Sequence, residues 1–300
     1  MKTTIKLSSW LTAFAVIGAL TFTSCKKESS INNSTQDTPA EVAATMATTS
    51  EDAATEAQFD DVFNITASIT SEDAGEELGM GANVSGLEEL GIRPTPNRVR
   101  CYTVTVVPSQ PGLFPKTVTI DFGNGCLGRD GKYRKGKIVT IFTNRMLVPG
   151  AKISTTFVGY HVDSFHIEGT HITENTSTSN MQGLKVSVID GKITNTISAK
   201  WRKWNSVKYI LQTEGNGTVN FPLDDVYKIT GAATGANSVG HTWSSTIVEP
   251  LIKKFTCRWI VKGTVRLVRN GREALLDYGN GNCDNLAIIY INGVAHTITL

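Results

Sequence analysis

Short runs of alternating apolar and polar residues, separated by turn residues, dominate the chain from Arg93 to its end. A period of two is the pattern of a strand with one buried face, and β-branched residues are enriched in strands. Tight hairpin turns are favoured by three dipeptides that stand between such runs: Asp190-Gly191, Asn270-Gly271 and Asn292-Gly293. The sequence therefore predicts an all-β domain over residues 93–300, a large, mostly antiparallel meander sheet or sandwich of roughly a dozen strands.

The N-terminus has the features of a bacterial lipoprotein signal peptide. Lys2 and Lys6 precede an apolar stretch, Leu11 to Phe22, which is too short to cross a membrane but suits a signal peptide. The stretch runs into Leu20-Thr-Phe-Thr-Ser-Cys25, which resembles a lipobox, although Leu20 lies five residues before the cysteine instead of three. We expect residues 1–24 to be a lipoprotein signal peptide and Cys25 to carry the lipid; the alternative is an ordinary secretory signal with an incidental cysteine.

The residues after Cys25 favour the outer membrane as the location. They are Lys26-Lys27-Glu28, with no Asp directly after the cysteine. Several acyl chains hold a protein on a membrane, whereas a single chain is marginal. The expected partner is therefore the membrane, through the N-terminal lipid, and the sequence leaves open whether the protein faces the periplasm or the exterior.

The segment 25–92 differs sharply in charge from the rest of the mature chain. Residues 28–92 hold 14 Asp and Glu and no Lys or Arg, whereas residues 93–300 hold 25 Lys and Arg against 13 Asp and Glu. Few residues of 29–50 can be buried, which predicts a disordered acidic tether. Residues 71–92 are Gly-rich and acidic and are expected to be a linker. One short helix over 51–70 is predicted by apolar residues at spacings of three to four: Phe59, Val62, Phe63, Ile65 and Ile69.

Two interpretations of this acidic segment remain open at the level of sequence. In the first it is only a solvated spacer between the lipid and the β-domain. In the second, its helix docks on the basic domain in a weak, salt-sensitive contact, because opposite charges on a tether raise the local concentration of one segment around the other.

Four cysteines organise the β-domain, and an even number in an exported protein indicates disulfides. Four cysteines allow three pairings. The middle of the interval from Cys101 to Cys126 falls in the turn-like Pro111-Gly-Leu-Phe-Pro115, and the middle of the interval from Cys257 to Cys283 falls at Asn270-Gly271. Because residues equidistant from a turn face each other across a hairpin, we expect Cys101 to pair with Cys126 and Cys257 with Cys283. The alternative is reduced structural thiols.

The same comparison shows an internal repeat. Asp121-Phe-Gly-Asn-Gly before Cys126 matches Asp277-Tyr-Gly-Asn-Gly before Cys283. The glycines supply positive-φ positions for a bend, and the Asp can fix the bend by accepting from backbone N–H groups.

These motifs also resemble those of a family. The repeat, taken with Gly128-Arg-Asp-Gly131, Lys135-Gly-Lys-Ile138 and Cys257-Arg-Trp-Ile-Val261 in this order, resembles uncharacterised cell-envelope lipoproteins of Bacteroidota over most of residues 93–300. The resemblance implies a lipoprotein with a β-domain, and it implies no particular activity, catalyst or ligand.

Candidate ligand-binding residues come from two basic segments. The first places five cations within nine residues on an expected turn: Arg129, Lys132, Arg134, Lys135 and Lys137. They form either a solvated edge that discourages aggregation or a surface for an acidic glycan or lipid phosphate. In the second segment, Lys200-Trp-Arg-Lys-Trp204, the odd spacing of Trp201 and Trp204 sends their rings to opposite faces of a strand, so only one ring can be exposed. Nucleic acid is not an expected partner of a lipid-anchored exported chain.

No cofactor and no metal site is expected. Three histidines and two acids crowd into one segment, but the parity of a strand separates them, which favours a polar exposed strand pair: His161, Asp163, His166, Glu168 and His171. One loop offers oxygen donors, although it lacks the spacing of an EF-hand, and calcium binding there is left open: Asp277, Asn280, Asn282 and Asp284.

The expected function is therefore that of a lipid-anchored envelope lipoprotein acting as a non-enzymatic binding or structural β-module with an unidentified ligand. The alternative is a surface hydrolase that uses groups on the sheet face. The sequence contains no Gly-x-Ser-x-Gly nucleophile elbow. A concave pocket with two titratable groups within about 6 Å favours the hydrolase, and a broad sheet without such a pocket favours binding.

Overall fold

The computed structural model describes residues 38–73, 78, 101–128, 130–178, 181–217, 222–257 and 259–300. All of them belong to one compact unit that runs from Asp37 to Leu300. The predicted signal peptide at 1–24, the expected lipid attachment residue Cys25 and most of the predicted linker lie outside the described residues.

A 35-residue helix, α1 (Pro39–Asp73), is much longer than the short helix predicted at 51–70 and includes the second half of the predicted tether. It begins with a capping box, in which Thr38 Oγ1 accepts from the Glu41 N–H at 3.3 Å and Glu41 Oε2 accepts from the Thr38 N–H at 2.9 Å. Pro39 occupies the first helical position, where its missing N–H costs nothing. The tether prediction was therefore wrong for residues 39–50.

The first half of α1 packs on the sheet largely through small side chains, which explains why the sequence predicted a tether there. Thr45, Thr48 and Thr49 are buried although they are polar. Each hydroxyl donates to the carbonyl four residues earlier, at 3.0, 2.9 and 3.1 Å. Because their polar atoms are satisfied within the helix, these residues can lie against the sheet without large apolar groups.

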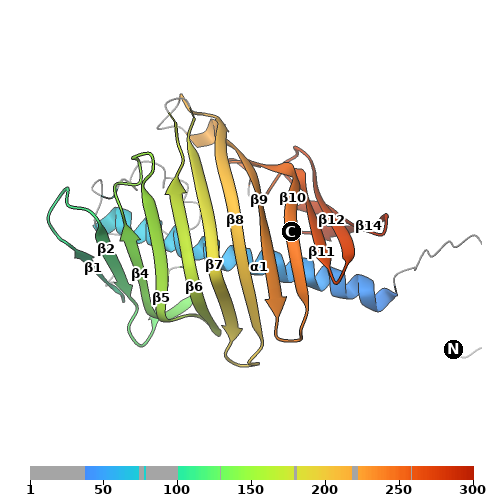
Figure 1. The fold of residues 1–300 in the computed structure, drawn as a ribbon, viewed down its shortest axis with the longest axis horizontal. Helices are drawn as coiled ribbons and strands as arrows, with labels where there is room; N and C mark the ends of the chain where they lie inside the picture. Colours follow the sequence, from blue (N-terminus) through green and yellow to red (C-terminus); the bar gives the residue numbers. More distant parts are fainter. Residues whose placement is uncertain are drawn as a thin grey trace, which may run out of the picture. The chain divides into compact units, whose positions relative to one another are not determined.

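The β-domain is one 14-stranded antiparallel sheet, so the meander prediction is confirmed and no sandwich forms among the described residues. Its strands follow one another in space in chain order, except that the short β3 pairs only with β4 (Figure 1). A 3₁₀ helix, η3 (Pro222–Asp224), lies between β8 and β9. The strands are β1 (Thr103–Val107), β2 (Lys116–Asp121), β3 (Cys126–Leu127), β4 (Tyr133–Phe142), β5 (Lys152–Val162), β6 (Phe165–Asn175), β7 (Gly183–Asn195), β8 (Trp201–Glu214), β9 (Val226–Asn237), β10 (Thr242–Lys254), β11 (Lys262–Arg269), β12 (Arg272–Asn280), β13 (Leu286–Ile291) and β14 (Val294–Thr299).

Two of the three predicted hairpin turns are confirmed. Asn270-Gly271 joins β11 to β12 and Asn292-Gly293 joins β13 to β14, with positive φ at all four residues. Asp190-Gly191 instead lies inside β7, where the register shifts between Val188 and Gly191. The positive φ of Asp190 there makes a bulge, and its N–H donates to the side chain of Asn205 at 2.7 Å.

Helix α1 lies across one face of the sheet, behind the strands in Figure 1. Phe59 and Val62 are 1% and 0% exposed, and the Phe59 ring stacks on that of Trp204 with 5.9 Å between centroids. Val42 and Met46, nearer the start of the helix, contact a second apolar cluster on β12 and β13. The spacer interpretation is therefore wrong for this helix, since side chains between Val42 and Thr66 form part of the core.

Acidic residues of α1 also meet polar groups of several strands. Asp61 pairs with Lys132 at 2.9 Å and with Arg134 at 3.1 Å, while Glu41 pairs with Arg272 at 2.5 Å. Apolar burial and opposite charge thus act together at the interface between helix and sheet.

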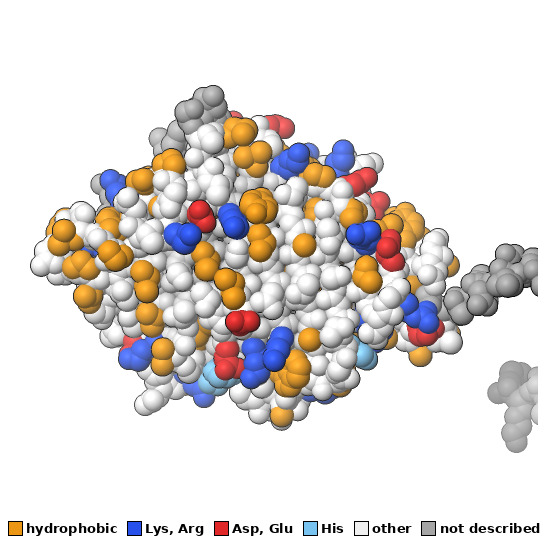
Figure 2. Space-filling model, viewed as in Figure 1, with side chains coloured by type: hydrophobic (Ala, Val, Ile, Leu, Met, Phe, Trp, Pro, Cys, Tyr) orange, Lys and Arg blue, Asp and Glu red, His pale blue; other side chains and the backbone are white. Residues whose placement is uncertain are grey.

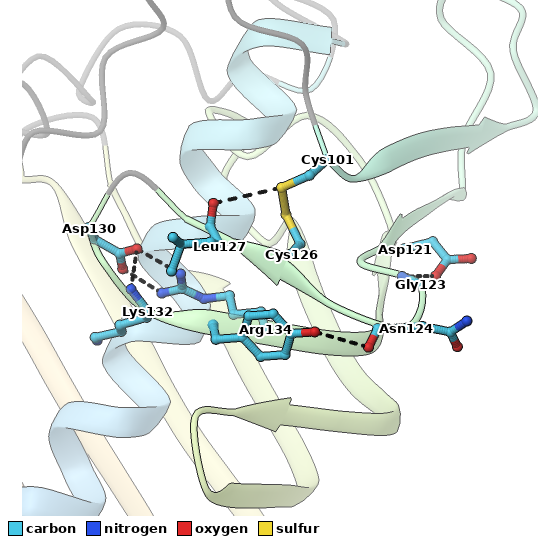
Figure 3. The surroundings of a disulfide bond; sticks show 10 residues. Cys101, Asp121, Gly123, Asn124, Cys126, Leu127, Asp130, Lys132 and Arg134 are labelled. Carbon is cyan, nitrogen blue, oxygen red and sulfur yellow. Dashed lines mark hydrogen bonds and ion pairs between the residues drawn. A yellow bond between two sulfur atoms is a disulfide. The ribbon is translucent and has the colours of Figure 1, made fainter.

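The structure pairs the cysteines as the hairpin spacing predicts. Cys101 is bonded to Cys126, with a Cα–Cα distance of 5.4 Å (Figure 3). Cys257 is bonded to Cys283, with a Cα–Cα distance of 5.3 Å. The repeated Asp has the same role in both copies: Asp121 Oδ1 accepts from the Gly123 N–H, and Asp277 Oδ1 accepts from the Gly279 N–H, each at 2.8 Å. The bend before each second cysteine is therefore fixed as the repeat indicates.

Within the described part of the chain, no helix combines the length and the apolar character needed to span a membrane.

Candidate binding site on the open face of the sheet

The sheet face opposite α1 is open in the described structure, since no other helix or sheet packs on it (Figure 2). Exposed aliphatic side chains on this face include those of Ile141, Val158 and Val207. Near the lower edge of the view in Figure 2, blue, red and pale-blue side chains gather close together. This edge is where the hairpins β5–β6 and β7–β8 turn.

The register of five neighbouring strands, β4 to β8, places five side chains in one row across this end of the sheet. Each is the direct cross-strand partner of the next: Lys135, His161, His166, Thr194 and Trp201. The adjacent row contains Glu168, Lys192 and Lys203, again as direct partners. We call these eight residues the basic patch.

Burial of the alternate residues shows that the basic patch faces away from α1. Arg134, between Lys132 and Lys135, is 4% exposed and bonded to Asp61 of the helix. Trp204, next to Lys203, is 2% exposed and donates to Asp52 of the helix. Because successive side chains of a strand point to opposite faces, the patch residues point to the open face.

Two lysines face each other directly in the basic patch, an arrangement that destabilises a sheet. Glu168 offsets one of them, with its carboxylate 3.1 Å from Lys192 Nζ. Lys203 is exposed and has no carboxylate partner in the described part of the chain; its ammonium lies over the ring of Trp201, 5.5 Å from the centroid. The patch therefore presents a cation next to an aromatic ring.

A buried hydroxyl lies in the row between the imidazole of His166 and the indole of Trp201. Thr194 Oγ1 has no hydrogen-bond partner among the described residues. Since buried polar atoms are nearly always hydrogen-bonded, this group is one that a bound ligand or water can satisfy.

The predicted basic segment divides between the two faces of the sheet. Lys135 and Lys137 lie on β4 and are exposed, and Lys137 pairs with Asp121 at 2.7 Å. This hydrogen bond, with one from the Gly123 N–H, holds the pKa of the Asp121 carboxyl below its usual value. Arg129 lies outside the described residues.

Arg134 is not available to a ligand, which corrects the prediction for this residue. It binds Asp130 through two nitrogens, at 2.9 and 2.6 Å (Figure 3). It also contacts Asp61 at 3.1 Å. Burial disfavours the charged guanidinium, but the hydrogen bonds and charges of these carboxylates outweigh it and raise the pKa of Arg134. The ammonium of Lys132 likewise forms an ion pair with Asp61. Both residues therefore hold the helix on the sheet.

Trp204 is also excluded from the open face, as a correction to the predicted set. Its indole N–H donates to Asp52 Oδ1 at 2.9 Å, and the indole of Trp243 donates to the same oxygen at 2.8 Å. The prediction that only one of Trp201 and Trp204 can be exposed is correct, since Trp201 is half-buried on the open face.

The histidine segment forms a hairpin. His161 and His166 are cross-strand partners on the open face, whereas His171 lies on the helix side and is 2% exposed. Burial lowers the pKa of His171 to about 4. The expected polar strand pair is therefore present, except that one of its histidines is in the core.

A cavity of about 120 Å³ lies between α1 and strands β8 to β12. Asp52 and Glu56 line it from the helix, and Lys208 and Tyr278 line it from the sheet. Glu56 and Lys208 form an ion pair. Burial lowers the pKa of the Lys208 ammonium to about 8, with Asp52 opposing the shift, and burial raises the pKa of Tyr278 to about 12.

The loop considered for calcium lines a shallow hollow of about 120 Å³. Asp277 accepts from the Gly279 N–H, and Asp284 accepts from the Leu286 N–H at 3.0 Å, so both acids fix the loop itself. Among the described residues, no three or more His, Cys, Asp or Glu side chains are grouped to hold a metal ion.

Comparisons with known proteins gave no match to a family model, a curated protein or a solved structure.

The sequence reasoning missed the pairing of Lys192 with Lys203. The signal was present, because both lie at equal distances from the turn between β7 and β8, as the two cysteine pairs do about their own turns. The row from Lys135 to Trp201 depends on four consecutive strand registers, and the bulges in β5, β6 and β7 make these registers hard to predict from spacing.

Proposed function

We propose that this chain is a lipid-anchored lipoprotein of the outer membrane whose sheet acts as a non-enzymatic binding module for an acidic glycan. The observation that carries the proposal is the pair Lys192 and Lys203, directly opposed on an open face beside Trp201. A like-charged pair costs stability in the free protein, and a bound anion removes that cost.

The aromatic ring favours a sugar over a bare anion. Sugar rings present apolar C–H faces that pack on indoles, and the ammonium of Lys203 lies next to the indole of Trp201. A sugar with a carboxylate or sulfate fits both groups at once. A lipid phosphate could contact the lysine ammonium groups, but it has no sugar face to pack on the indole.

Anchoring rests on the lipobox-like segment before Cys25. In this proposal the acylated cysteine holds the module on the membrane, and α1 forms part of the module instead of spacing it from the lipid. Replacing Cys25→Ser should move the protein from the membrane to the soluble fraction. Failure of the unaltered protein to incorporate labelled fatty acid would overturn the anchoring proposal.

Binding is tested with polygalacturonate as the acidic glycan and dextran as the neutral one. We expect binding of the acidic glycan alone, and a loss of at least about tenfold in Lys203→Ala, because a charged contact contributes more than about 1.4 kcal/mol. Lys185→Ala is the matched control, since Lys185 lies over the ring of Tyr209 on the same two strands, 5.9 Å from the centroid. Equal loss in both variants would show that only net charge matters.

Vesicles of phosphatidylglycerol and of phosphatidylcholine test the lipid phosphate. If Lys203→Ala weakens binding to the phosphatidylglycerol vesicles and leaves glycan binding unchanged, the ligand class proposed here is wrong.

A hydrolase is the second candidate, and the observation that favours it is the cavity beneath α1. There Glu56 contacts Lys208, and Asp52 contributes a second carboxylate. Such a cavity satisfies the criterion of two titratable groups within about 6 Å. An esterase and glycosidase substrate panel tests it: activity abolished by Glu56→Gln in a folded protein would support the hydrolase, and no turnover by the unaltered protein would reject it.

A further inference from the structure

Two imidazoles of the basic patch lie face to face on the open side of the sheet. His161 of β5 and His166 of β6 are direct cross-strand partners near the turn of their hairpin. Their ring centroids are 4.5 Å apart, with 20° between the ring planes. Both side chains are half-buried.

The hydrogen bonding of His161 determines which of its nitrogens is free. Its Nδ1 lies 2.9 Å from the carbonyl oxygen of Gly159. A carbonyl oxygen only accepts, so Nδ1 carries the proton and Nε2 keeps its lone pair. This is the state of a metal-binding histidine, whose other ring nitrogen usually donates to a carbonyl or carboxylate.

His166 has a carboxylate on the corresponding side. Its Nδ1 lies 3.8 Å from Glu168 Oε2, and Glu168 is held in place by Lys192 at 3.1 Å. Burial lowers the pKa of His166, with Glu168 opposing this and His161, Lys192 and Lys135 adding to it. The neutral imidazole, which is the form that binds metals, is therefore favoured near neutral pH.

We propose that His161 and His166 together bind one divalent transition-metal ion through their Nε2 atoms. Imidazole nitrogen suits Zn²⁺, Cu²⁺ and Ni²⁺ far better than Ca²⁺ or Mg²⁺. Because the lone pairs of stacked imidazoles lie in nearly parallel planes, both side chains must rotate out of the stack before their Nε2 atoms reach the metal–nitrogen distance of about 2.0–2.1 Å found for zinc. Water completes the coordination, and the positive charges of Lys135 and Lys192 make the ion exchangeable instead of structural.

This inference is independent of the proposed glycan binding. The experiment titrates the full chain with ZnCl₂ alone and with NiCl₂ alone, by calorimetry, at neutral pH. A parallel titration with CuCl₂ follows quenching of tryptophan fluorescence, because Trp201 lies in the same row of the sheet.

The variants are His161→Gln and His166→Gln, with His296→Gln on the outer strand β14 as the matched control. We expect one ion per chain, and at least about tenfold weaker binding in each of the first two variants, since losing an outer-shell partner alone costs about 10-fold to 100-fold. Circular dichroism and urea unfolding confirm that each variant is folded.

Unchanged affinity in both folded variants, or an equal loss in His296→Gln, would overturn the proposal. Lys203→Ala separates the two hypotheses, because it should weaken glycan binding and leave zinc binding intact. The pH dependence separates them as well: acidification protonates the imidazoles, which should abolish zinc binding and strengthen the binding of an anion.

Discussion

Trp204 donates its indole N–H to Asp52 at 2.9 Å, although 152 positions separate the two residues in the chain. The same carboxylate oxygen accepts from Trp243 at 2.8 Å, so one acid of α1 joins the helix to both β8 and β10. Asp52 is 8% exposed, and its pairing with two indoles makes the helix a component of the fold rather than a tether on its surface.

Removal of this carboxylate should destabilise the protein. Asp52→Ala leaves two buried indole donors without an acceptor, and each such donor costs about 1–3 kcal/mol. We expect a loss of about 2–4 kcal/mol in the free energy of unfolding, measured by urea titration. Asp52→Asn keeps an acceptor oxygen of the same shape and should cost clearly less. An equal loss in the two variants would show that the hydrogen bonds do not hold the helix.

Substitution of a glycine in β9 should also destabilise the protein. A Cβ at Gly235 would lie 2.2 Å from the Trp243 ring, so Gly235→Ala must displace the indole that binds Asp52. Overpacking of this kind costs about 1–3 kcal/mol. Gly217→Ala is the control, because nothing lies within 4 Å of its Cβ position. If both variants unfold at the same urea concentration, the contact with Trp243 is not tight.

The limits of sequence reasoning are clear in the two halves of α1. Phe59 and Val62 follow a helical period, which correctly predicted the second half. The buried residues near the start of the helix are mainly threonines, which a search for apolar residues does not detect. The start of the helix nevertheless has a sequence signature, the capping box Thr38-Pro-Ala-Glu41. Cysteine spacing predicted both disulfides because it depends only on local hairpins.

The candidate site was harder to predict for a different reason. Arg134 and Lys135 are adjacent, and only the strand parity decides which one is exposed. This parity depends on where β4 begins, and a shift by one residue would exchange the two faces. The sequence predicted a turn at these residues, and a turn does not define which side chains share a face. The prediction therefore put Arg134, which faces the helix, in the same set as Lys135, which faces the open side.

The docking of α1 should survive high salt, contrary to the weak, salt-sensitive contact expected from charge alone. At about 1 M NaCl the Debye length is about 3 Å, which screens exposed pairs such as that of Lys132 with Asp61. The burial of Phe59 and Val62 is unaffected by screening. We expect amide exchange of α1 to remain protected at low and high salt. Loss of protection at high salt alone would show that charge dominates.

Both disulfides should contribute to stability. In the chain-entropy model, a bridge that closes a loop of 25 or 26 residues stabilises by roughly 3–4 kcal/mol. We expect Cys257→Ser with Cys283→Ser to lower the free energy of unfolding by about this amount, and reducing agent to lower it further through the remaining bridge. Non-reducing peptide mapping should link Cys101 only to Cys126. A link from Cys101 to Cys257 or Cys283 would contradict the structure.

Acid should destabilise the protein through His171. Burial lowers the pKa of this imidazole to about 4 in the folded state, against about 6.5 in an unfolded chain. Between these values the unfolded state binds more protons, so stability rises with pH over this window and is lost as the pH falls from about 6.5 to about 4. The difference corresponds to on the order of 3 kcal/mol. His166, whose pKa is also lowered, adds to the slope in the same direction.

Urea unfolding at pH values from about 4 to about 7 measures this slope. His171→Gln should flatten it, because the variant has no group at that position to protonate. His296→Gln, a change of the same kind on β14, is measured in parallel as the control for the substitution itself. If His171→Gln keeps the full slope while remaining folded, the acid sensitivity comes from the carboxylates that bind cations of the sheet, among which Asp130 has a lowered pKa because Arg134 outweighs its burial.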